Sequence, residues 1–392
     1  MSEVYIAQAL RTPIGRFLGT LKDYQAADLG EIVLKEILQK TSLPPDAVDE
    51  VFIGSALQAG QGQNVARQIA LKAGLALETP ATTVNMVCGS GLQAVLSGVR
   101  SILAGDNEIV VVGGTESMSN APYLDFDLRT GLKMGHNSQK DALVYDGLED
   151  AFSHIPMGLT SENLVSRYNL TRQQLDEYAY QSQLKAKQAI EAKRFEAEIV
   201  PIKIQTKKES FLFKTDEHPR FTPLEKLLTL KPAFKAGGSV TAGNSSGIND
   251  GAALLVLTTK KAATKYHLPL LAKITGWGQA GVSPEVMGLG PIEATKKALK
   301  KADLTLANLD LVELNEAFSA QVLVNIKELN LDPKIVNING GAIALGHPIG
   351  ASGARILVSL VHALLQNKTA KNGLASLCVG GGMGISVTIQ KV

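Results

Sequence analysis

The chain of 392 residues has two cysteines, and each stands where a thiol could be reactive. Cys88 lies in the segment 84–91, VNMVCGSG, at the expected junction of an apolar strand and a helix. Cys378 is followed by one valine and three glycines. A helix N-terminus presents unpaired N–H groups and the positive end of the helix dipole, which favour a thiolate. The pattern predicts a nucleophile at Cys88, although free cysteines are also common as buried packing residues and that interpretation stays open on the local sequence.

Two further segments could bring polar groups to these thiols. Asn315 follows the apolar run 309–314, and His347 lies in the glycine-rich segment 339–350. Both segments lie near the predicted C-terminal end of a strand, where ligands bind in open α/β sheets. A neutral imidazole can take the proton of a cysteine and make it a nucleophile. The thiol of Cys378 would suit a step that removes a proton from carbon.

Other chemistries lack their motifs. Glycines 113 and 114 do not belong to a dinucleotide-binding fingerprint, and no Walker A motif occurs. The segment 89–91, GSG, is out of frame for the G-x-S-x-G motif of serine hydrolases. The remaining histidines show no paired metal-ligand spacing with either cysteine, so no metal is predicted. These are His136, His154, His218, His267 and His362.

The composition predicts a cytoplasmic protein of more than one domain. The length exceeds that of a single comfortable core. The first residues enter a strand directly, without the pattern of a signal peptide, and no run of 18 or more apolar residues predicts a membrane span. Two cysteines argue against a disulfide-stapled secreted fold. The formal net charge of +2 gives no sign of a nucleic-acid or membrane-surface partner.

Apolar runs of strand length alternate with segments of helical periodicity. Strands are expected at 4–9, 49–54 and 108–112, and helices at 27–40 and 91–104. This alternation predicts an α/β fold with a largely parallel sheet and helices on its faces.

The same order of features recurs near the C-terminus. In the first copy the pair 84–85 (VN) precedes the pair 90–91 (SG), a helix, a strand and two glycines. In the second copy, 336–337 (VN) precedes 352–353 (SG), followed by a helix at 354–366, a strand at 374–379 and two glycines. We interpret this as two copies of one α/β unit. The predicted domains are 1–262 and 270–392.

A different stretch, roughly residues 120–238, interrupts the first domain. It contains a capping box at Thr171, which opens a helix expected to run to about Arg194. An insertion over an α/β core is typical of a substrate lid or a cofactor-binding region.

Taken in order, these motifs resemble those of the thiolases, in particular the acetyl-CoA acetyltransferases. The resemblance extends over nearly the whole chain. It rests on the segments 11–15 (RTPIG), 85–91 (NMVCGSG), 241–252 (TAGNSSGINDGA), 315–318 (NEAF), 340–348 (GGAIALGHP) and 378–382 (CVGGG). It implies duplicated βαβαβαββ domains in α/β/α/β/α layers, with the insertion as a lid or loop region.

The resemblance also implies a role for each reactive residue. Cys88 would carry an acyl group as a thioester, and His347 would activate it. Cys378 would deprotonate the methyl group of acetyl-CoA, or protonate the enolate in the reverse reaction. Asn315 would hold a water that binds the enolate oxygen together with His347. The backbone N–H groups of Cys88 and Gly380 would bind the tetrahedral oxyanion, a use of donors typical of acyl transfer.

Coenzyme A or acetyl-CoA is implied as a substrate, with no permanently bound cofactor. Ser246 and Ala242 would contact its pantetheine, and Arg220 its nucleotide end. The other residues implied for the coenzyme A site are apolar, namely Leu148, Met157, Phe234, Met287 and Phe318. The family further implies a homo-oligomer, with a tetramer expected and a dimer as the alternative.

The implied activity is the reversible Claisen condensation of two acetyl-CoA to acetoacetyl-CoA and CoA. The alternative is a degradative 3-ketoacyl-CoA thiolase, because Pro156 replaces a histidine of many short-chain members, whereas segment 133–135 (KMG) follows the short-chain pattern. From another class, a thiol redox sensor or a non-catalytic CoA-binding protein stays open, although no C-x-x-C motif supports it.

Overall fold

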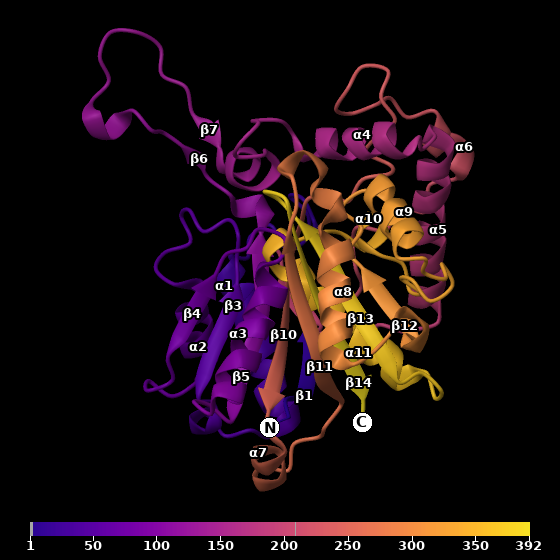
Figure 1. Cartoon of the computed structure of the whole chain (residues 1–392). Helices are drawn as coiled ribbons and strands as arrows, with labels where there is room; N and C mark the ends of the chain where they lie inside the picture. Colours follow the sequence, from indigo (N-terminus) through magenta and orange to yellow (C-terminus); the bar gives the residue numbers. More distant parts are fainter. Residues whose placement is uncertain (1–2, 208) are drawn as a thin grey trace.

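Ten strands form one continuous hydrogen-bonded sheet in the computed structural model, which describes residues 3–207 and 209–392 (Figure 1). Their order is β12-β13-β14-β11-β1-β10-β5-β3-β4, and β2 pairs with β10. The strands are β1 (Tyr5–Arg11), β2 (Gly15–Arg16), β3 (Glu50–Gly54), β4 (Ala81–Val84), β5 (Ile109–Ser117), β10 (Asn249–Thr258), β11 (Ala272–Gly281), β12 (Leu311–Leu314), β13 (Asn372–Val379) and β14 (Met383–Lys391).

The sheet is built from two copies of one strand arrangement. In the N-terminal half, β4 and β5 run parallel to β3, β10 is antiparallel to β5, and β1 is antiparallel to β10. In the C-terminal half, a bridge at Val336 and strand β13 run parallel to β12, β14 is antiparallel to β13, and β11 is antiparallel to β14. The halves join where β1 pairs with β11. The predicted duplication is confirmed.

The prediction of a largely parallel sheet is wrong. The pairs formed by β10, β14, β1 and β11 are antiparallel, and only the pairs around β3 and β12 are parallel. Three glycines separate β13 from β14, and Gly381 and Gly382 have φ of 80° and 82°. So short a link allows only a hairpin, because a parallel connection needs a crossover of a dozen residues or more.

Helices lie in three layers around the sheet. Helices α1 (Ala26–Thr41) and α2 (Val65–Lys72) pack on one face of the N-terminal half. Helices α3 (Ser90–Ala104) and α11 (Ile349–Gln366) form the middle layer, and α8 (Gly290–Ala302) covers the outer face of the C-terminal half. Successive β5 residues face alternate helix layers, which explains its β-branched run. The predicted layers are confirmed.

Glycines let the two middle helices cross closely. A Cβ atom on Gly91 of α3 would lie 2.9 Å from the Ala354 nitrogen of α11, and one on Gly353 would lie 2.6 Å from the Leu92 nitrogen. The glycines at 113 and 114 do not end a strand, since β5 continues to Ser117. A Cβ on Gly114 would lie 2.1 Å from the Gly350 oxygen at the start of α11. The repeated Ser-Gly pairs therefore mark the helix crossing between the two halves.

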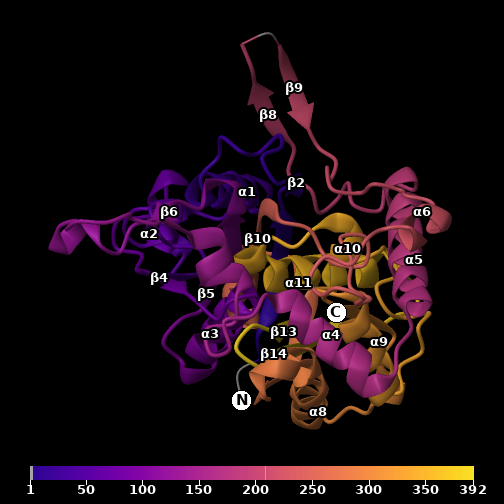
Figure 2. The same cartoon turned by 90° about the horizontal axis from the view of Figure 1, so that it is seen from above.

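The insertion covers one end of the sheet and extends two arms (Figures 1 and 2). One arm spans residues 123–141 between β6 (Tyr123–Leu124) and β7 (Lys140–Asp141), and the other is the hairpin of β8 (Ile202–Gln205) and β9 (Ser210–Phe213). The remaining helices are α4 (Met157–Tyr168), α5 (Arg172–Glu191), α6 (Leu224–Leu228), α7 (Lys260–Lys265), α9 (Ser319–Glu328) and α10 (Ala342–Leu345). The short 3₁₀ or π turns are Pro45–Ala47, Met118–Asn120, Leu128–Thr130, Leu143–Leu148, Pro284–Leu289 and Leu306–Asn308. The predicted capping box at Thr171 is present.

Two segments, Val87–Ala104 and Ile349–Gln366, are long and apolar enough to cross a membrane by length and composition. In the structure 61% and 89% of their residues are buried inside the protein. They form the middle helix layer, so their apolar character is that of core helices.

Candidate active site

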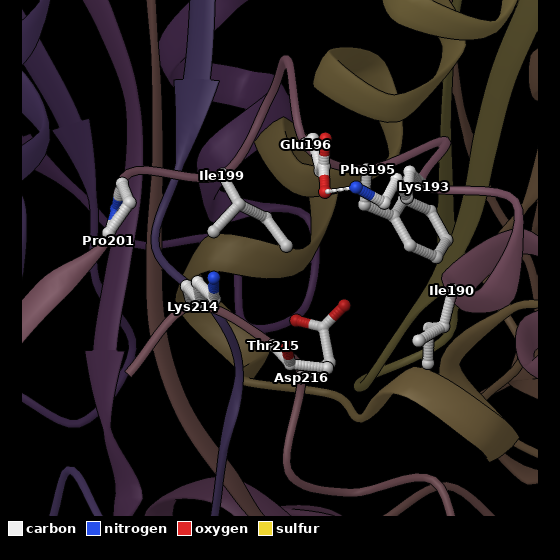
Figure 3. Close-up of a pocket in the computed structure, with 9 residues that line it drawn as sticks. All are labelled: Ile190, Lys193, Phe195, Glu196, Ile199, Pro201, Lys214, Thr215 and Asp216. Carbon is white, nitrogen blue, oxygen red and sulfur yellow. Dashed lines mark ion pairs between the residues drawn. The ribbon is translucent and has the colours of Figure 1, made fainter. Parts of the chain in front are cut away.

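The cavity drawn in Figure 3 lies away from both cysteines and has a volume of about 290 Å³. Three of its four charged side chains are paired. Both carboxylate oxygens of Asp216 bind the buried Arg11 guanidinium at 2.7 and 2.9 Å, and Lys193 pairs with Glu196. No cysteine or histidine is among its lining residues in the described chain. This cavity therefore lacks both residue types of the predicted active site.

A second cavity, of about 580 Å³, brings the predicted coenzyme A residues together with His347. Seven of the eight predicted residues line it, namely Leu148, Met157, Arg220, Phe234, Ala242, Ser246 and Phe318. The eighth, Met287, is buried in the apolar cluster that contains Phe318 and Cys378. Arg16 also lines the cavity and was not predicted. Its wall is largely apolar, with two arginines.

The segment before α3 holds Cys88 in a strained turn. Val87 has φ of 47°, a left-handed conformation that a β-branched residue rarely adopts. Its N–H donates to Asn85 Oδ1 at 2.9 Å, and its carbonyl accepts the Ser90 hydroxyl at 2.6 Å. Ser90 Oγ also accepts the Met86 N–H at 2.8 Å. These bonds fix the place of the Cys88 side chain between β4 and α3.

The Cys88 thiol lies among apolar side chains that include Ile349, two residues after His347. Its side chain stays partly exposed. Burial raises the pKa of Cys88 to about 11, and the backbone N–H groups of Gly380 and of Cys88 itself oppose this rise. The expectation of a stabilised thiolate is therefore wrong for the unliganded protein, because removal of the sulfur from water outweighs the helix terminus. The two N–H groups are those predicted for the oxyanion.

Cys378 lies at the end of β13, fully buried in a cluster with Met157 and Phe318. Burial raises the pKa of Cys378, and the neighbouring Cys88 raises it further. The two cysteines, 290 positions apart in the chain, therefore lie close enough to interact. Gly380, which follows Val379, has ordinary contacts here, since a Cβ on it would lie 3.4 Å from Val87 and 3.7 Å from the Met157 sulfur.

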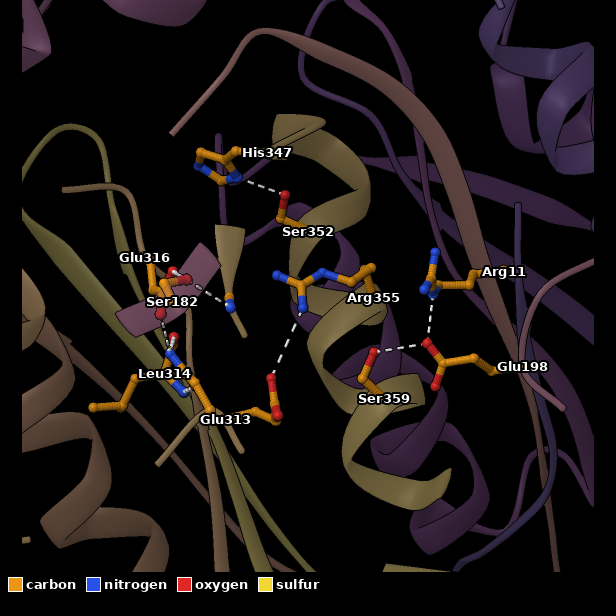
Figure 4. Close-up of polar contacts among 12 residues, drawn as sticks. Arg11, Ser182, Glu198, Glu313, Leu314, Glu316, His347, Ser352, Arg355 and Ser359 are labelled. Atoms are coloured by element: carbon orange, nitrogen blue, oxygen red, sulfur yellow. Dashed lines mark hydrogen bonds and ion pairs between the residues drawn. The ribbon is translucent and has the colours of Figure 1, made fainter. Parts of the chain in front are cut away.

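His347 is held through its backbone N–H and through its ring Nδ1, whose contact with Ser352 is drawn in Figure 4. Its backbone N–H donates to Asn249 Oδ1 at 2.9 Å, and its Nδ1 lies 2.5 Å from Ser352 Oγ. Its Nε2 lies 3.5 Å from Asn315 Nδ2. Burial lowers the pKa of His347 to about 3, with a further contribution from Arg355. The imidazole is therefore neutral at physiological pH.

Asn315 reaches this imidazole from the residue after β12. Its backbone N–H donates to the Ser376 carbonyl of β13 at 2.9 Å. Asn315 and Cys378 therefore lie at the same ends of two neighbouring parallel strands. Its Oδ1 is buried and has no hydrogen-bond partner among the described residues. A free buried acceptor beside the imidazole is compatible with the predicted role of Asn315 in holding a water.

Several supporting residues were not predicted. Glu116 of β5 is buried and accepts the N–H groups of Ala56, Leu57 and Gly350. It links the loop after β3 to the helix that follows His347. Burial raises the pKa of Glu116 to about 7. Only Ser352 had a signal in the sequence, since it occupies the repeat position of Ser90.

Arg355 and Glu313 form a buried pair behind His347 (Figure 4). The Arg355 Nη1 lies 3.8 Å from Glu313 Oε2, and none of the guanidinium nitrogens has a hydrogen-bond partner among the described residues. Burial raises the pKa of Glu313 to about 8. Neither residue lines the coenzyme A cavity, and the charge of Arg355 acts on His347 from behind by lowering its pKa. In residues 3–207 and 209–392, no group of three or more His, Cys, Asp or Glu is placed to hold a metal.

Two family models match the chain. The model described as "Thiolase, N-terminal domain" matches residues 4–261, and the model described as "Thiolase, C-terminal domain" matches residues 268–391.

Similar proteins cover the chain from end to end. An acetyl-CoA acetyltransferase of Pseudomonas aeruginosa is 51% identical over 100% of both chains, and a probable acetyl-CoA acyltransferase of Staphylococcus aureus is 50% identical over 100% of both. Among solved structures, the Bacillus anthracis acetyl-CoA acetyltransferase is 45% identical, with a TM-score of 0.97 over 100% of this chain and 99% of that one. Human mitochondrial 3-ketoacyl-CoA thiolase in complex with CoA is 42% identical, with a TM-score of 0.95 over 100% and 98%.

Proposed function

Because the chain belongs to the thiolase family and is an acyltransferase, we propose that it condenses two acetyl-CoA into acetoacetyl-CoA and CoA through an acetyl-Cys88 intermediate. The observation that carries this proposal is the meeting of Cys88 with Cys378 and the Gly380 N–H, beside the cavity that contains His347. A non-catalytic CoA-binding protein has no need of two such thiols at one point.

In the first half-reaction, Cys88 Sγ attacks the carbonyl carbon of acetyl-CoA. Its proton passes to His347 Nε2 and then to the leaving CoA sulfur. The N–H groups of Cys88 and Gly380 point at the Cys88 sulfur, which supports their role as donors to the oxyanion that forms there, an effect of about 3–4 kcal/mol per donor in acyl transfer.

In the second half-reaction, the Cys378 thiol gives its own proton to His347 Nε2, and the thiolate so formed takes a proton from the methyl group of a second acetyl-CoA. The resulting enolate attacks the acetyl carbon on Cys88, and the Cys88 sulfur leaves and takes the proton from His347. Burial raises the pKa of Cys378, which makes its thiolate a strong base towards carbon acids. The reaction conserves thioester bonds and can run in either direction.

The 580 Å³ cavity supports coenzyme A as the substrate carrier. Its apolar wall suits pantetheine, and Arg16 and Arg220 suit the phosphates of the nucleotide end. Ser246 offers a polar contact along the channel, as the sequence predicted.

A third cavity favours one alternative, the cleavage of longer 3-ketoacyl chains. It measures about 670 Å³ and is lined by Val87 and Gly380, which adjoin the reactive cysteines, and by Met157, which also lines the coenzyme A cavity. A longer acyl chain on Cys88 would have room there. Comparing kcat/KM for acetoacetyl-CoA and for 3-ketohexadecanoyl-CoA decides between the two activities.

Acetyl transfer to the enzyme tests the proposal directly. Incubation with radioactive acetyl-CoA should label wild-type protein and not the Cys88→Ala variant. The Cys378→Ser variant should still be labelled and should fail to condense, because it keeps the nucleophile and lacks the carbon base. Labelling of Cys88→Ala at the wild-type level, or an equal loss of both half-reactions in Cys378→Ser, would contradict the assigned roles.

Two further features belong to the proposal. Exposed apolar side chains on the β6–β7 arm, including Phe126, Leu128, Leu132 and Met134, support assembly into a homotetramer. Two free cysteines support a reducing, cytoplasmic location.

A further inference from the structure

We propose that Ser352 is a positioning residue that holds His347 with the proton on Nδ1, so that Nε2 is free to accept the proton of Cys88. The role rests on the proposed function, in which His347 is the base of acyl transfer. Ser352 does not line the coenzyme A cavity and would act only through the imidazole.

The hydroxyl hydrogen of Ser352 is already in use. Ser352 Oγ donates to the Pro348 carbonyl at 2.8 Å, the bond that serines in helices make to the carbonyl four residues earlier. A hydroxyl has one hydrogen and two lone pairs. The 2.5 Å contact with His347 Nδ1 is then a bond in which Nδ1–H donates to Ser352 Oγ. Ser352 is fully buried, and so it keeps this partner.

The other half of the protein contains the same device. Ser90 occupies the matching position at the start of α3, where its Oγ donates to the Val87 carbonyl and accepts the Met86 N–H. A backbone N–H can only donate, so in the bond between Met86 and Ser90 the serine oxygen is the acceptor. Ser90 fixes the turn that contains Cys88, and Ser352 fixes His347, so the duplicated serines each hold one reactive residue.

The far side of the imidazole agrees with this assignment. Nε2 faces the Asn315 Nδ2 group, which is a donor, at 3.5 Å. A proton on Nε2 would set two donors against each other in a buried place. With the proton on Nδ1, Nε2 presents a lone pair to Asn315 and to the cavity.

A neutral partner has a chemical consequence. In the Ser-His-Asp arrangement a carboxylate stabilises the imidazolium that forms, whereas a serine oxygen fixes the tautomer and adds no charge. His347 must return its proton to the CoA sulfur in the same half-reaction. An imidazolium that is oriented but weakly stabilised gives the proton back readily.

The test compares three variants of the full-length protein. Ser352→Ala removes the acceptor, Ser352→Thr keeps a hydroxyl, and Ser359→Ala is the matched control. Ser359 is a buried serine of the same helix that bonds Glu198 at 3.1 Å, away from His347. The measurements are the rate of Cys88 acetylation by mass spectrometry after rapid quenching, kcat and KM for acetyl-CoA, and Tm.

Ser352→Ala should lower the acetylation rate and kcat by about 10- to 100-fold, the range of loss seen when the hydrogen-bond partner of a metal-ligating histidine is removed. KM should stay within about twofold, because the cavity wall is unchanged. Ser352→Thr should restore most of the rate, and Ser359→Ala should keep it.

Acetylation of Ser352→Ala at the wild-type rate would overturn the proposal. So would an equal loss in Ser352→Thr at unchanged Tm, because a retained hydroxyl would then have no effect. Failure of the wild-type protein to acetylate Cys88 is a separate result, which would refute the proposed function and the role of Ser352 with it.

Discussion

The reactive residues are all neutral in the unliganded protein. Burial raises the pKa of Cys88 to about 11 and lowers the pKa of His347 to about 3. At pH 7 the pair is therefore a thiol and an imidazole, not a thiolate and an imidazolium. In the proposed reaction the proton moves when the substrate carbonyl arrives, and the N–H of Gly380, which faces the Cys88 thiol, would stabilise the charge that develops.

This electrostatic state predicts an unusual pH profile. An ordinary histidine loses its base form as pH falls through 6.5, but His347 stays neutral down to about 3. The rate of Cys88 acetylation should therefore show no loss with a midpoint near pH 6.5 when it is measured between pH 5 and 8. The folded protein binds this proton less readily than the unfolded chain, so the stability that His347 contributes is present above pH 6.5 and is lost as pH falls towards 3. A sigmoidal loss of acetylation centred near 6.5 would show that the imidazole is solvated.

The candidate reactive residues could be predicted from the sequence because their types are rare, but the residues that hydrogen-bond to them could not. Cys88, Cys378 and His347 stand out because thiols are scarce in the chain and the imidazole lies in a glycine-rich loop. Ser352 and Asn249 are common residue types whose importance depends on what folding places beside them. Their roles follow from tertiary contacts, and the repeat that aligns Ser352 with Ser90 marks the position without revealing its contact with His347.

At the scale of elements, the helices were easier to predict than the sheet. The expected helix at 27–40 is α1 (Ala26–Thr41), and the expected helix at 91–104 is α3 (Ser90–Ala104). Helical periodicity and capping are local properties of the sequence. Strand direction depends on connections, and the short glycine link between β13 and β14 was the one local sign of an antiparallel pair.

The α3–α11 crossing predicts the cost of a single methyl group. In Gly353→Ala, the new Cβ would lie 2.6 Å from the Leu92 nitrogen, so the helices must separate. We expect a loss of about 2 kcal/mol in the free energy of unfolding, typical of overpacking, although alanine is intrinsically the better helix former by about 1 kcal/mol. Urea denaturation of the variant and the wild type measures this difference in the free energy of unfolding.

Gly281→Ala is the control, because no atom lies within 4 Å of the position that its methyl group would take at the end of β11. It should unfold like the wild type. A Gly353→Ala protein that is equally stable would mean that the two middle helices are free to shift.

At the scale of the whole molecule, the insertion contributes in two ways. Its helix α4 lies over the end of the sheet where the site is found, and α5 runs down the side of the molecule next to α9 and α10 (Figure 1). Met157 at the start of α4 lines the coenzyme A cavity. Its β6–β7 arm extends away from the body and presents apolar side chains that nothing in a single chain covers. The insertion was predicted from its place between the two repeated units, but its arms were not.

The arm predicts a dependence of assembly on its apolar side chains. The double variant Leu132→Asp with Met134→Asp puts two charges on the proposed contact and should lower the mass measured by light scattering, with the circular dichroism spectrum unchanged. Ser138→Asp with Gln139→Asp adds the same charges at exposed polar positions of the same arm and should keep the mass. Equal masses for both variants and the wild type would exclude the arm from the assembly.

The central position of β1 in the sheet determines when this strand can pair during synthesis of the chain. Strand β1 begins at Tyr5, yet its partners β10 and β11 begin at Asn249 and Ala272. At about 5–20 residues per second of synthesis, roughly 15 to 55 seconds pass before the second neighbour exists. During translation this apolar strand has no hydrogen-bonded neighbour on either side. Folds that depend on pairing between strands so distant in the sequence form slowly, and their unpaired strands can aggregate in the meantime. A cell that produces this protein therefore has to protect its first strand until most of the polypeptide has left the ribosome.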